Sequence, residues 1–98
     1  MTNVTDFLTP STGMTITGSL TVVGKVAFMY LMVNTSSAQS AKWLAATVKS
    51  DYRPANYAYG VEWNSGAAFE LGTDGRIRLN SAVSANTNSY ISFTYMLA

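Results

Sequence analysis

Residues 52–80 read YRPANYAYGVEWNSGAAFELGTDGRIRLN, and this stretch decides the fold. Its second half contains two short runs in which apolar and charged residues alternate on either side of a turn at residues 73–75. A period of two is typical of β-strands, so the pattern predicts a β-hairpin. Two loop lengths are open to this hairpin, and they place the side chains differently.

The hydrophobic pattern decides between the two loop lengths. A two-residue Asp-Gly loop would pair Glu70 with Leu79 and so set a charge beside an apolar residue. A three-residue loop instead brings apolar residues together on one face and opposite charges together on the other: Phe69 with Leu79, Leu71 with Ile77, and Glu70 with Arg78. We therefore predict the longer loop, closed by Gly75 in the left-handed conformation. The same pattern sets the register, because a slip of one residue would turn every side chain over.

The composition limits the kind of protein. The chain has 98 residues, which is enough for one small domain with a modest core. It is 48% hydrophobic and only 11% charged, against roughly 25% charged in an average globular domain. Two explanations for so few charges remain open: another chain covers apolar surface, or Ser, Thr and Asn make a surface that is polar without being charged.

Several classes of function lack the residues they need. The chain contains no Cys and no His, which removes thiolate chemistry, Ser-His and Cys-His catalysis and the commonest metal ligands. The net charge is +1 without a basic run, so a nucleic-acid partner is not expected. No apolar run approaches the roughly 18 residues of a membrane span, and the first residues do not resemble a secretory signal. We expect no cofactor, no metal and no membrane partner.

The first third of the chain divides into three segments. Residues 1–13 are mostly polar and are expected to form a leader or linker. Residues 14–24, MTITGSLTVVG, alternate apolar and polar positions and predict one or two strands. Residues 25–33, KVAFMYLMV, are apolar on both faces, so both faces must be covered. Their Val, Phe and Tyr content favours a strand over a short core helix.

The rest of the chain is read as further strands. Residues 38–48 are open to two interpretations, because their alanines fall at helical spacings while the all-β context favours a strand over residues 43–48. Additional strands are expected where apolar alternation resumes between turn signals, at residues 56–63, 67–72, 76–79 and 89–97. About seven strands and no secure helix predict an all-β fold, a small antiparallel β-barrel or sandwich.

The order of these segments resembles a known family. The chain carries a Gly-punctuated Thr/Val segment, a long apolar strand and a Trp-Leu-Ala segment, followed by Tyr52-Arg53-Pro54, Asp74-Gly75-Arg76-Ile77 and Ser89-Tyr90-Ile91. Over residues 13–98 this series is similar to the head domain of receptor-binding proteins from phages of Gram-positive bacteria, the lactococcal baseplate proteins most of all. The resemblance implies a receptor-binding head over residues 25–98, preceded by the end of a neck at residues 14–24.

The resemblance also implies a role in host adsorption. Heads of this family are homotrimers that bind cell-wall saccharide in clefts between subunits, and they attach to the baseplate through a neck and shoulder. We therefore expect a virion protein at the tail tip or baseplate, with a homotrimer, host polysaccharide and baseplate or tail proteins as partners. Residues 25–33 are the candidate for packing near the threefold axis. The family's own saccharide contacts do not transfer, because this chain has no His and has Arg78 and Leu79 where the family's Trp pair follows the turn.

Residue type and position next to turns suggest candidate saccharide contacts. A sugar site needs an aromatic face and polar groups that fix hydroxyls. Trp63, beside a turn, is the first candidate, with a buried core Trp as the alternative. The other candidates are polar residues near turns or on the hairpin: Glu62, Asn64, Asp51, Arg53 and Arg78. Structural roles are the alternatives, such as a charge pair of Arg78 with Glu70. Trp43 and Tyr59 are expected in the core, and Asp74 is expected to serve the turn.

Two other functions remain open. One is a structural or assembly domain at the tip of a phage tail fibre, without a ligand. The other is an accessory domain of a phage glycan-degrading enzyme. Catalysis by this chain is not expected. A glycosidase needs two carboxylates facing one substrate, and the chain has only five acidic residues. Among these, Glu62 and Glu70 are expected on adjacent strands of one hairpin and could be neighbours.

Overall fold

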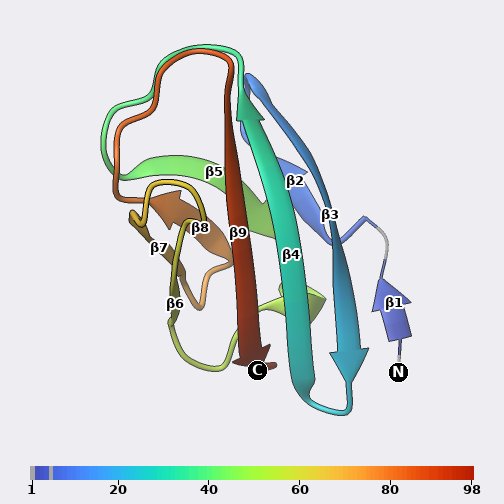
Figure 1. The fold of residues 1–98 in the computed structure, drawn as a ribbon. Coiled ribbons are helices and arrows are strands. Elements are labelled where there is room, and N and C mark those ends of the chain that lie inside the picture. Colours follow the sequence, from blue (N-terminus) through green and yellow to red (C-terminus); the bar gives the residue numbers. More distant parts are fainter. Residues whose placement is uncertain (1, 5) are drawn as a thin grey trace.

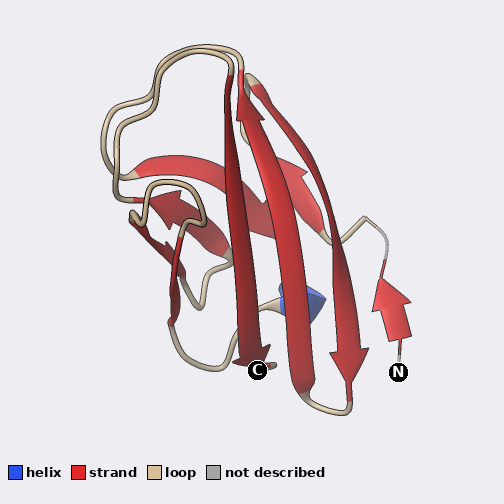
Figure 2. Ribbon diagram, in the orientation of Figure 1, coloured by secondary structure: helices blue, strands red, loops and turns tan. Residues whose placement is uncertain are grey.

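Two antiparallel sheets pack face to face in the computed structural model, which describes residues 2–4 and 6–98 (Figure 1). The long sheet has the strand order β1 (Thr2–Val4), β3 (Met14–Val23), β4 (Val26–Thr35) and β9 (Thr87–Met96). The short sheet has the order β2 (Leu8–Pro10), β5 (Trp43–Val48), β8 (Arg76–Leu79), β7 (Ala68–Leu71) and β6 (Ala58–Val61). Within the described residues the only helix is one 3₁₀ turn, η1 (Ser50–Tyr52), drawn in blue in Figure 2.

The predicted hairpin is confirmed residue by residue. β7 and β8 pair Phe69 with Leu79, Glu70 with Arg78 and Leu71 with Ile77. The loop is closed by backbone hydrogen bonds from Gly72 N–H to the Arg76 carbonyl (3.0 Å) and from Gly75 N–H to the Gly72 carbonyl (2.9 Å). Gly75 has φ +87°, the left-handed conformation that the sequence predicted. The apolar members of the hairpin are buried and face the long sheet.

β4 lies between β3 and β9 and pairs with each of them over ten residues. One face of β4 carries Ala27, Met29, Leu31 and Val33, all buried in the core between the sheets. The opposite face carries Val26, Phe28, Tyr30 and Met32 and points away from the short sheet; the side chain of Phe28 is 47% exposed. The structure therefore covers one of the two apolar faces of this strand and leaves the other to solvent in a single chain.

The all-β prediction is confirmed, and the open choice between barrel and sandwich is resolved. The two sheets do not close into a barrel, because β1 and β2 end the sheets on one side and β9 and β6 end them on the other. Nine strands are present in the described residues, against about seven expected. Residues 43–48 form a strand, β5, rather than a helix.

The two extra strands come from the segment expected to be a leader. β2 pairs with β5, and Phe7, which precedes β2, is buried in the core. β1 pairs with β3. Polar composition concealed these short edge strands, since only a few apolar residues mark them. Residues 1 and 5 lie outside the described part of the chain, and the expected division into leader, neck and head stays a prediction.

Alanine substitutions at two glycines test how tightly the hairpin loop is packed. A Cβ atom on Gly75 would lie 2.5 Å from the Val48 carbonyl oxygen and 2.7 Å from Arg53 Nε. Gly66 has a similar φ, +71°, but open space around it. Gly66→Ala should therefore lower the free energy of unfolding by about 1 kcal/mol, the cost of the left-handed conformation alone. Gly75→Ala should lower it by about 3 kcal/mol or more, because a clash is added. Chemical denaturation measures both, and equal losses would contradict the packing described for Gly75.

Candidate functional site

The six predicted site residues fall in three separate places. Trp63, Glu62 and Asn64 lie in the turn between β6 and β7. Asp51 and Arg53 lie in and just after η1. Arg78 lies in β8 on the outer face of the short sheet, the face turned away from the core. The structure therefore brings Trp63, Glu62 and Asn64 together and separates them from the other three predicted residues.

Glu62 is a buried carboxylate that ties the turn to the edge of the long sheet. Its side chain is 5% exposed. Oε2 accepts a hydrogen bond from the backbone N–H of Tyr90 in β9 (2.7 Å). Oε1 accepts from the backbone N–H groups of Asn64 (3.0 Å) and Ser65 (2.8 Å) and from the Ser65 hydroxyl (3.0 Å). With both oxygens occupied by protein donors, Glu62 acts here as a positioning residue for the turn.

Two opposing effects act on the pKa of Glu62. Burial raises it, since a charge is removed from water, whereas the hydrogen bonds from Tyr90, Ser65 and Asn64 stabilise the charged form. The hydrogen bonds together outweigh burial and hold the pKa of Glu62 below its ordinary value of 4.5. The carboxylate is therefore ionised at neutral pH, the state in which it accepts all four hydrogen bonds.

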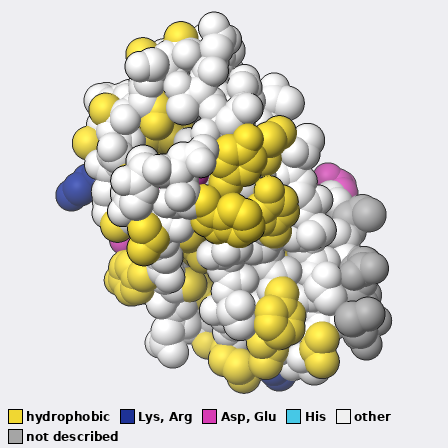
Figure 3. Space-filling model, in the orientation of Figure 1, with side chains coloured by type: hydrophobic (Ala, Val, Ile, Leu, Met, Phe, Trp, Pro, Cys, Tyr) yellow, Lys and Arg dark blue, Asp and Glu magenta, His cyan; other side chains and the backbone are white. Residues whose placement is uncertain are grey.

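Trp63 is held at the surface by this arrangement. Its backbone N–H donates to the Tyr90 carbonyl (3.0 Å), and its side chain is 62% exposed, so the alternative of a buried Trp63 is wrong. The indole ring lies against the ring of Tyr30 in β4, with centroids 5.4 Å apart and planes inclined by 43°. Hydrophobic side chains gather over β4 and β9 in Figure 3. Trp63 and Tyr30 thus form an exposed aromatic pair with a fixed backbone beneath it.

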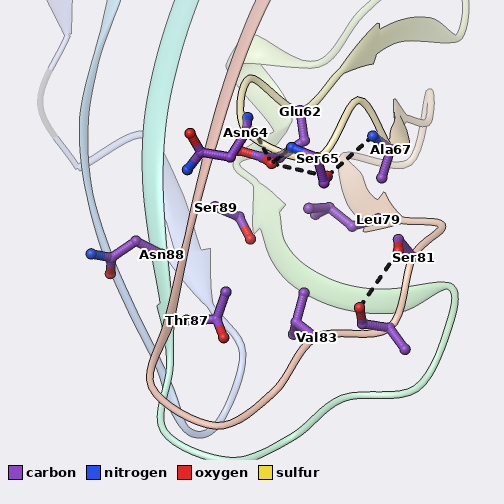
Figure 4. A pocket seen from close by; sticks show the side chains of 11 residues that line it. Glu62, Asn64, Ser65, Ala67, Leu79, Ser81, Val83, Thr87, Asn88 and Ser89 are labelled. Atoms are coloured by element: carbon purple, nitrogen blue, oxygen red, sulfur yellow. Dashed lines mark hydrogen bonds between the residues drawn. The ribbon is translucent and has the colours of Figure 1, made fainter.

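Asn64 faces a different side of the same turn. Its side chain lines a hollow of about 220 Å³ between the turn and the chain that leads from β8 into β9 (Figure 4). Most other lining residues are small, among them Ser65, Ala67 and Ser81. Trp63 is absent from this lining, so the hollow and the aromatic pair are separate features.

Asp51 and Arg53 lie at the other end of β9 from Trp63. The carbonyl of Arg53 accepts a hydrogen bond from Ala98 N–H (3.0 Å), beyond the last residue of β9. Its guanidinium Nε donates to the Val48 carbonyl (3.0 Å) beside the hairpin loop, which is a structural contact. Asp51 is exposed in η1. These residues do not share a surface with Trp63.

Arg78 and Glu70 are opposite each other across β7 and β8, as predicted. They do not form an ion pair: within the described residues, no basic side chain lies within 4.0 Å of the Glu70 carboxylate. Arg78 Nη1 instead donates a long hydrogen bond to the Lys42 carbonyl (3.4 Å). Asp74 serves the turn as expected, accepting from Arg76 N–H through Oδ1 (3.1 Å).

Sequence reasoning misplaced one aromatic residue. Tyr59 was expected in the core, but its side chain is 72% exposed. The reason lies on the opposite side of β6, where a Cβ atom on Gly60 would fall 2.4 Å from Cζ of Phe69. The Phe69 ring fills the inner face at this point and leaves the aromatic residues of β6 on the outer face. By contrast, Trp43 is buried as expected, with Nε1 donating to the Ser81 carbonyl (2.9 Å).

Glu62 and Glu70, the pair considered for catalysis, lie in different surroundings. Glu62 is buried beneath its turn and saturated with hydrogen bonds, whereas Glu70 lines a hollow on the outer face of the short sheet. Among residues 2–4 and 6–98, no three Asp or Glu side chains gather closely enough to hold a metal ion. No helix in the described part of the chain has the length and hydrophobicity to cross a membrane. A further hollow, of about 410 Å³, lies between β2 and β3 and contains none of the predicted site residues.

Comparisons with known proteins add no assignment, since no family model matches the chain and no curated protein is significantly similar to it in sequence.

The role of Glu62 can be tested through stability. Glu62→Gln should lower the free energy of unfolding by about 1.5–3 kcal/mol, because an amide NH₂ cannot accept a hydrogen bond and leaves buried N–H donors unpaired. Glu70→Gln, at a carboxylate without an ion pair, is the matched control and should change it by less than about 0.5 kcal/mol. Equal effects of the two substitutions would contradict the positioning role.

The pH dependence of unfolding gives a second readout. Because the pKa of Glu62 is lowered in the folded protein, its carboxylate stabilises the fold above pH 4.5, and this contribution disappears as the pH falls through the lower folded value. Denaturation at a series of pH values should show this acid-dependent loss in the native protein and a smaller loss in Glu62→Gln.

Proposed function

We propose that this chain is a receptor-binding domain of a phage tail tip or baseplate, which attaches the particle to host cell-wall saccharide without catalysis. The observation that carries the proposal is the exposed pair of Trp63 and Tyr30. Sugars present an apolar ring face that packs on an aromatic ring, and their hydroxyls are fixed by neighbouring polar groups. The Glu62 hydrogen bonds support this role, since a fixed turn presents the indole without losing conformational entropy on binding.

The proposed assembly is a homotrimer whose contact covers the outer face of the long sheet around Phe28 and leaves the ring of Tyr30 beside Trp63 open to ligand. This face carries Phe28, Tyr30 and Met32 along its central strand, and Ser or Thr residues lie opposite them on β3. The apolar stripe with a polar, uncharged border suits a contact between copies of the same chain. Trp63 lies at the β9 side of this face, so in such a trimer it would stand near a neighbouring subunit. Each site would bind weakly, and several sites per particle would supply avidity.

The same apolar face supports a second candidate function. A structural tip domain of a tail fibre would also need an apolar face for assembly, but it would have no use for an exposed Trp63. The two candidates therefore differ in whether Trp63 contributes to binding. In both, baseplate or tail proteins would attach through the N-terminal side.

Oligomeric state tests the proposed assembly. The native protein should show three times the 10.5 kDa mass of the chain in light scattering. Phe28→Lys should give a folded monomer, because it places an ammonium group in the contact. Val61→Lys, at an exposed residue of β6, should remain a trimer. A native protein that is monomeric at high concentration would contradict the assembly.

Saccharide binding tests the proposed function. Host cell-wall polysaccharide should quench Trp63 fluorescence, while buried Trp43 serves as an internal reference. Trp63→Ala should weaken binding to host cells by about tenfold or more, the equivalent of about 1.4 kcal/mol. Trp63→Phe should retain most of the binding because it keeps a ring. Thr9→Ala, at an exposed residue of β2 on the opposite edge of the short sheet, should stay within about twofold of native. Unchanged binding by Trp63→Ala would favour the structural candidate.

A further inference from the structure

The outward side of β6 has an inverted hydrophobic pattern. Tyr57, Tyr59, Val61 and Trp63 alternate along the chain and are 54%, 72%, 59% and 62% exposed. A strand with one solvated face normally keeps its apolar side chains inward and its polar ones outward. Here the inner positions hold Ala58 and Gly60, because Phe69 occupies the space beneath them. We name the line of Tyr57, Tyr59 and Trp63, with Val61 between them, the β6 ridge.

The rings of the β6 ridge follow one another along the chain. Tyr57 and Tyr59 have nearly parallel rings, inclined by 25° with centroids 6.3 Å apart. Trp63 follows in the turn after β6, where its ring lies against Tyr30. It stands six positions after Tyr57, so the two residues are at most roughly 20 Å apart along the chain. This length accommodates several consecutive sugar rings rather than one.

Polar groups without strong protein partners lie beside the Tyr57 end of the ridge. Tyr59 is the cross-strand neighbour of Glu70, and Glu70 is the neighbour of Arg78. Cross-strand neighbours are separated by about 5 Å, so both charged groups lie within reach of a molecule packed on the Tyr59 ring. Among the residues that the structure describes, none forms an ion pair with the Glu70 carboxylate, and Arg78 makes a long hydrogen bond of 3.4 Å to the Lys42 carbonyl. These groups offer an acceptor and several donors to hydroxyl groups.

The charges around this end cancel. A shallow hollow of about 70 Å³ contains Arg76 and Arg78 together with Glu70 and Asp74 and is bordered by Tyr57. The residues of the β6 ridge itself are uncharged. A strongly anionic or cationic ligand would meet an opposite and a like charge together, whereas a neutral polyhydroxylated chain would find both donors and acceptors.

From this arrangement we infer that the β6 ridge binds an extended segment of a neutral polysaccharide, several sugar units long, with Tyr57 and Tyr59 as contacts additional to Trp63. The inference rests on the proposed function and deepens it: the ligand is an internal stretch of a polysaccharide chain, not a single terminal sugar. Glu70 and Arg78 fix hydroxyls at the Tyr57 end, and the aromatic rings pack on successive sugar faces.

The test measures binding against the length of the ligand. The probes are mono-, di-, tetra- and hexasaccharide fragments prepared from cell-wall polysaccharide of a Gram-positive bacterium that the protein binds, titrated by calorimetry. For the native protein we expect affinity to rise by about tenfold or more between the disaccharide and the tetrasaccharide. Tyr59→Ala and Tyr57→Ala should remove most of this rise, whereas Tyr59→Phe should keep it. Thr9→Ala, at an exposed residue of β2 on the opposite edge of the short sheet, should stay within about twofold of native. Thermal unfolding checks that each variant is folded.

Each alternative outcome has a distinct meaning. If a monosaccharide binds as tightly as the hexasaccharide, and Trp63→Ala abolishes binding while Tyr57→Ala and Tyr59→Ala do not, the extended site is wrong and the proposed function stands. If whole cells bind but none of their saccharide fragments do, a saccharide ligand of any length is wrong. If neither cells nor cell-wall polysaccharide from a panel of bacteria bind, the proposed function fails, and the extended site fails with it.

Discussion

The ring of Phe69 governs how this small sandwich is built. It projects from the short sheet, meets Phe93 of the long sheet edge to face at a centroid distance of 4.6 Å, and is 1% exposed. It also occupies the space that a side chain at position 60 would need. The Phe69 ring therefore contributes to the core that joins the two sheets, and it leaves no room for a side chain at position 60 on the inner side of β6. The aromatic residues of that strand have no interior position left and lie on the surface.

A second constraint, the set of hydrogen bonds accepted by buried Glu62, fixes the backbone at one end of this surface. Apart from Glu62, the turn after β6 meets the long sheet through the backbone hydrogen bond of Trp63 with Tyr90 and through the Trp63 ring against Tyr30. The buried carboxylate adds hydrogen bonds to β9 and within the turn. The packing of Phe69 thus leaves the aromatic side chains on the surface, and the hydrogen bonds of Glu62 fix the turn that carries Trp63. Glu70, which has no ion-pair partner among residues 2–4 and 6–98, supplies an acceptor beside the other end, where solvation keeps the cost of an unpaired charge low.

The parts of the fold set by local pattern were predictable from the sequence, and the parts set by tertiary contacts were not. Alternation within residues 69–79 determined loop length and register, because any other pairing would bury a charge. β1 and β2 carry too few apolar residues for a local signal, and their pairing depends on the strands beside them. For the site, Trp63 was identified by its position next to a turn. The outward direction of Tyr59 was missed, since it depends on where the Phe69 ring lies and not on the residues of β6 alone.

The central claim is that the aromatic row on β6 is a saccharide-binding surface. A crystal structure of the native protein soaked with cell-wall oligosaccharide tests it most directly, because it shows which side chains the sugar touches. Sugar rings are expected to pack on Trp63 and Tyr59, with hydroxyls within hydrogen-bond distance of Glu70 or Arg78. Sugar bound elsewhere, such as in the hollow beside Asn64, with these rings free or covered by a neighbouring subunit, would contradict it.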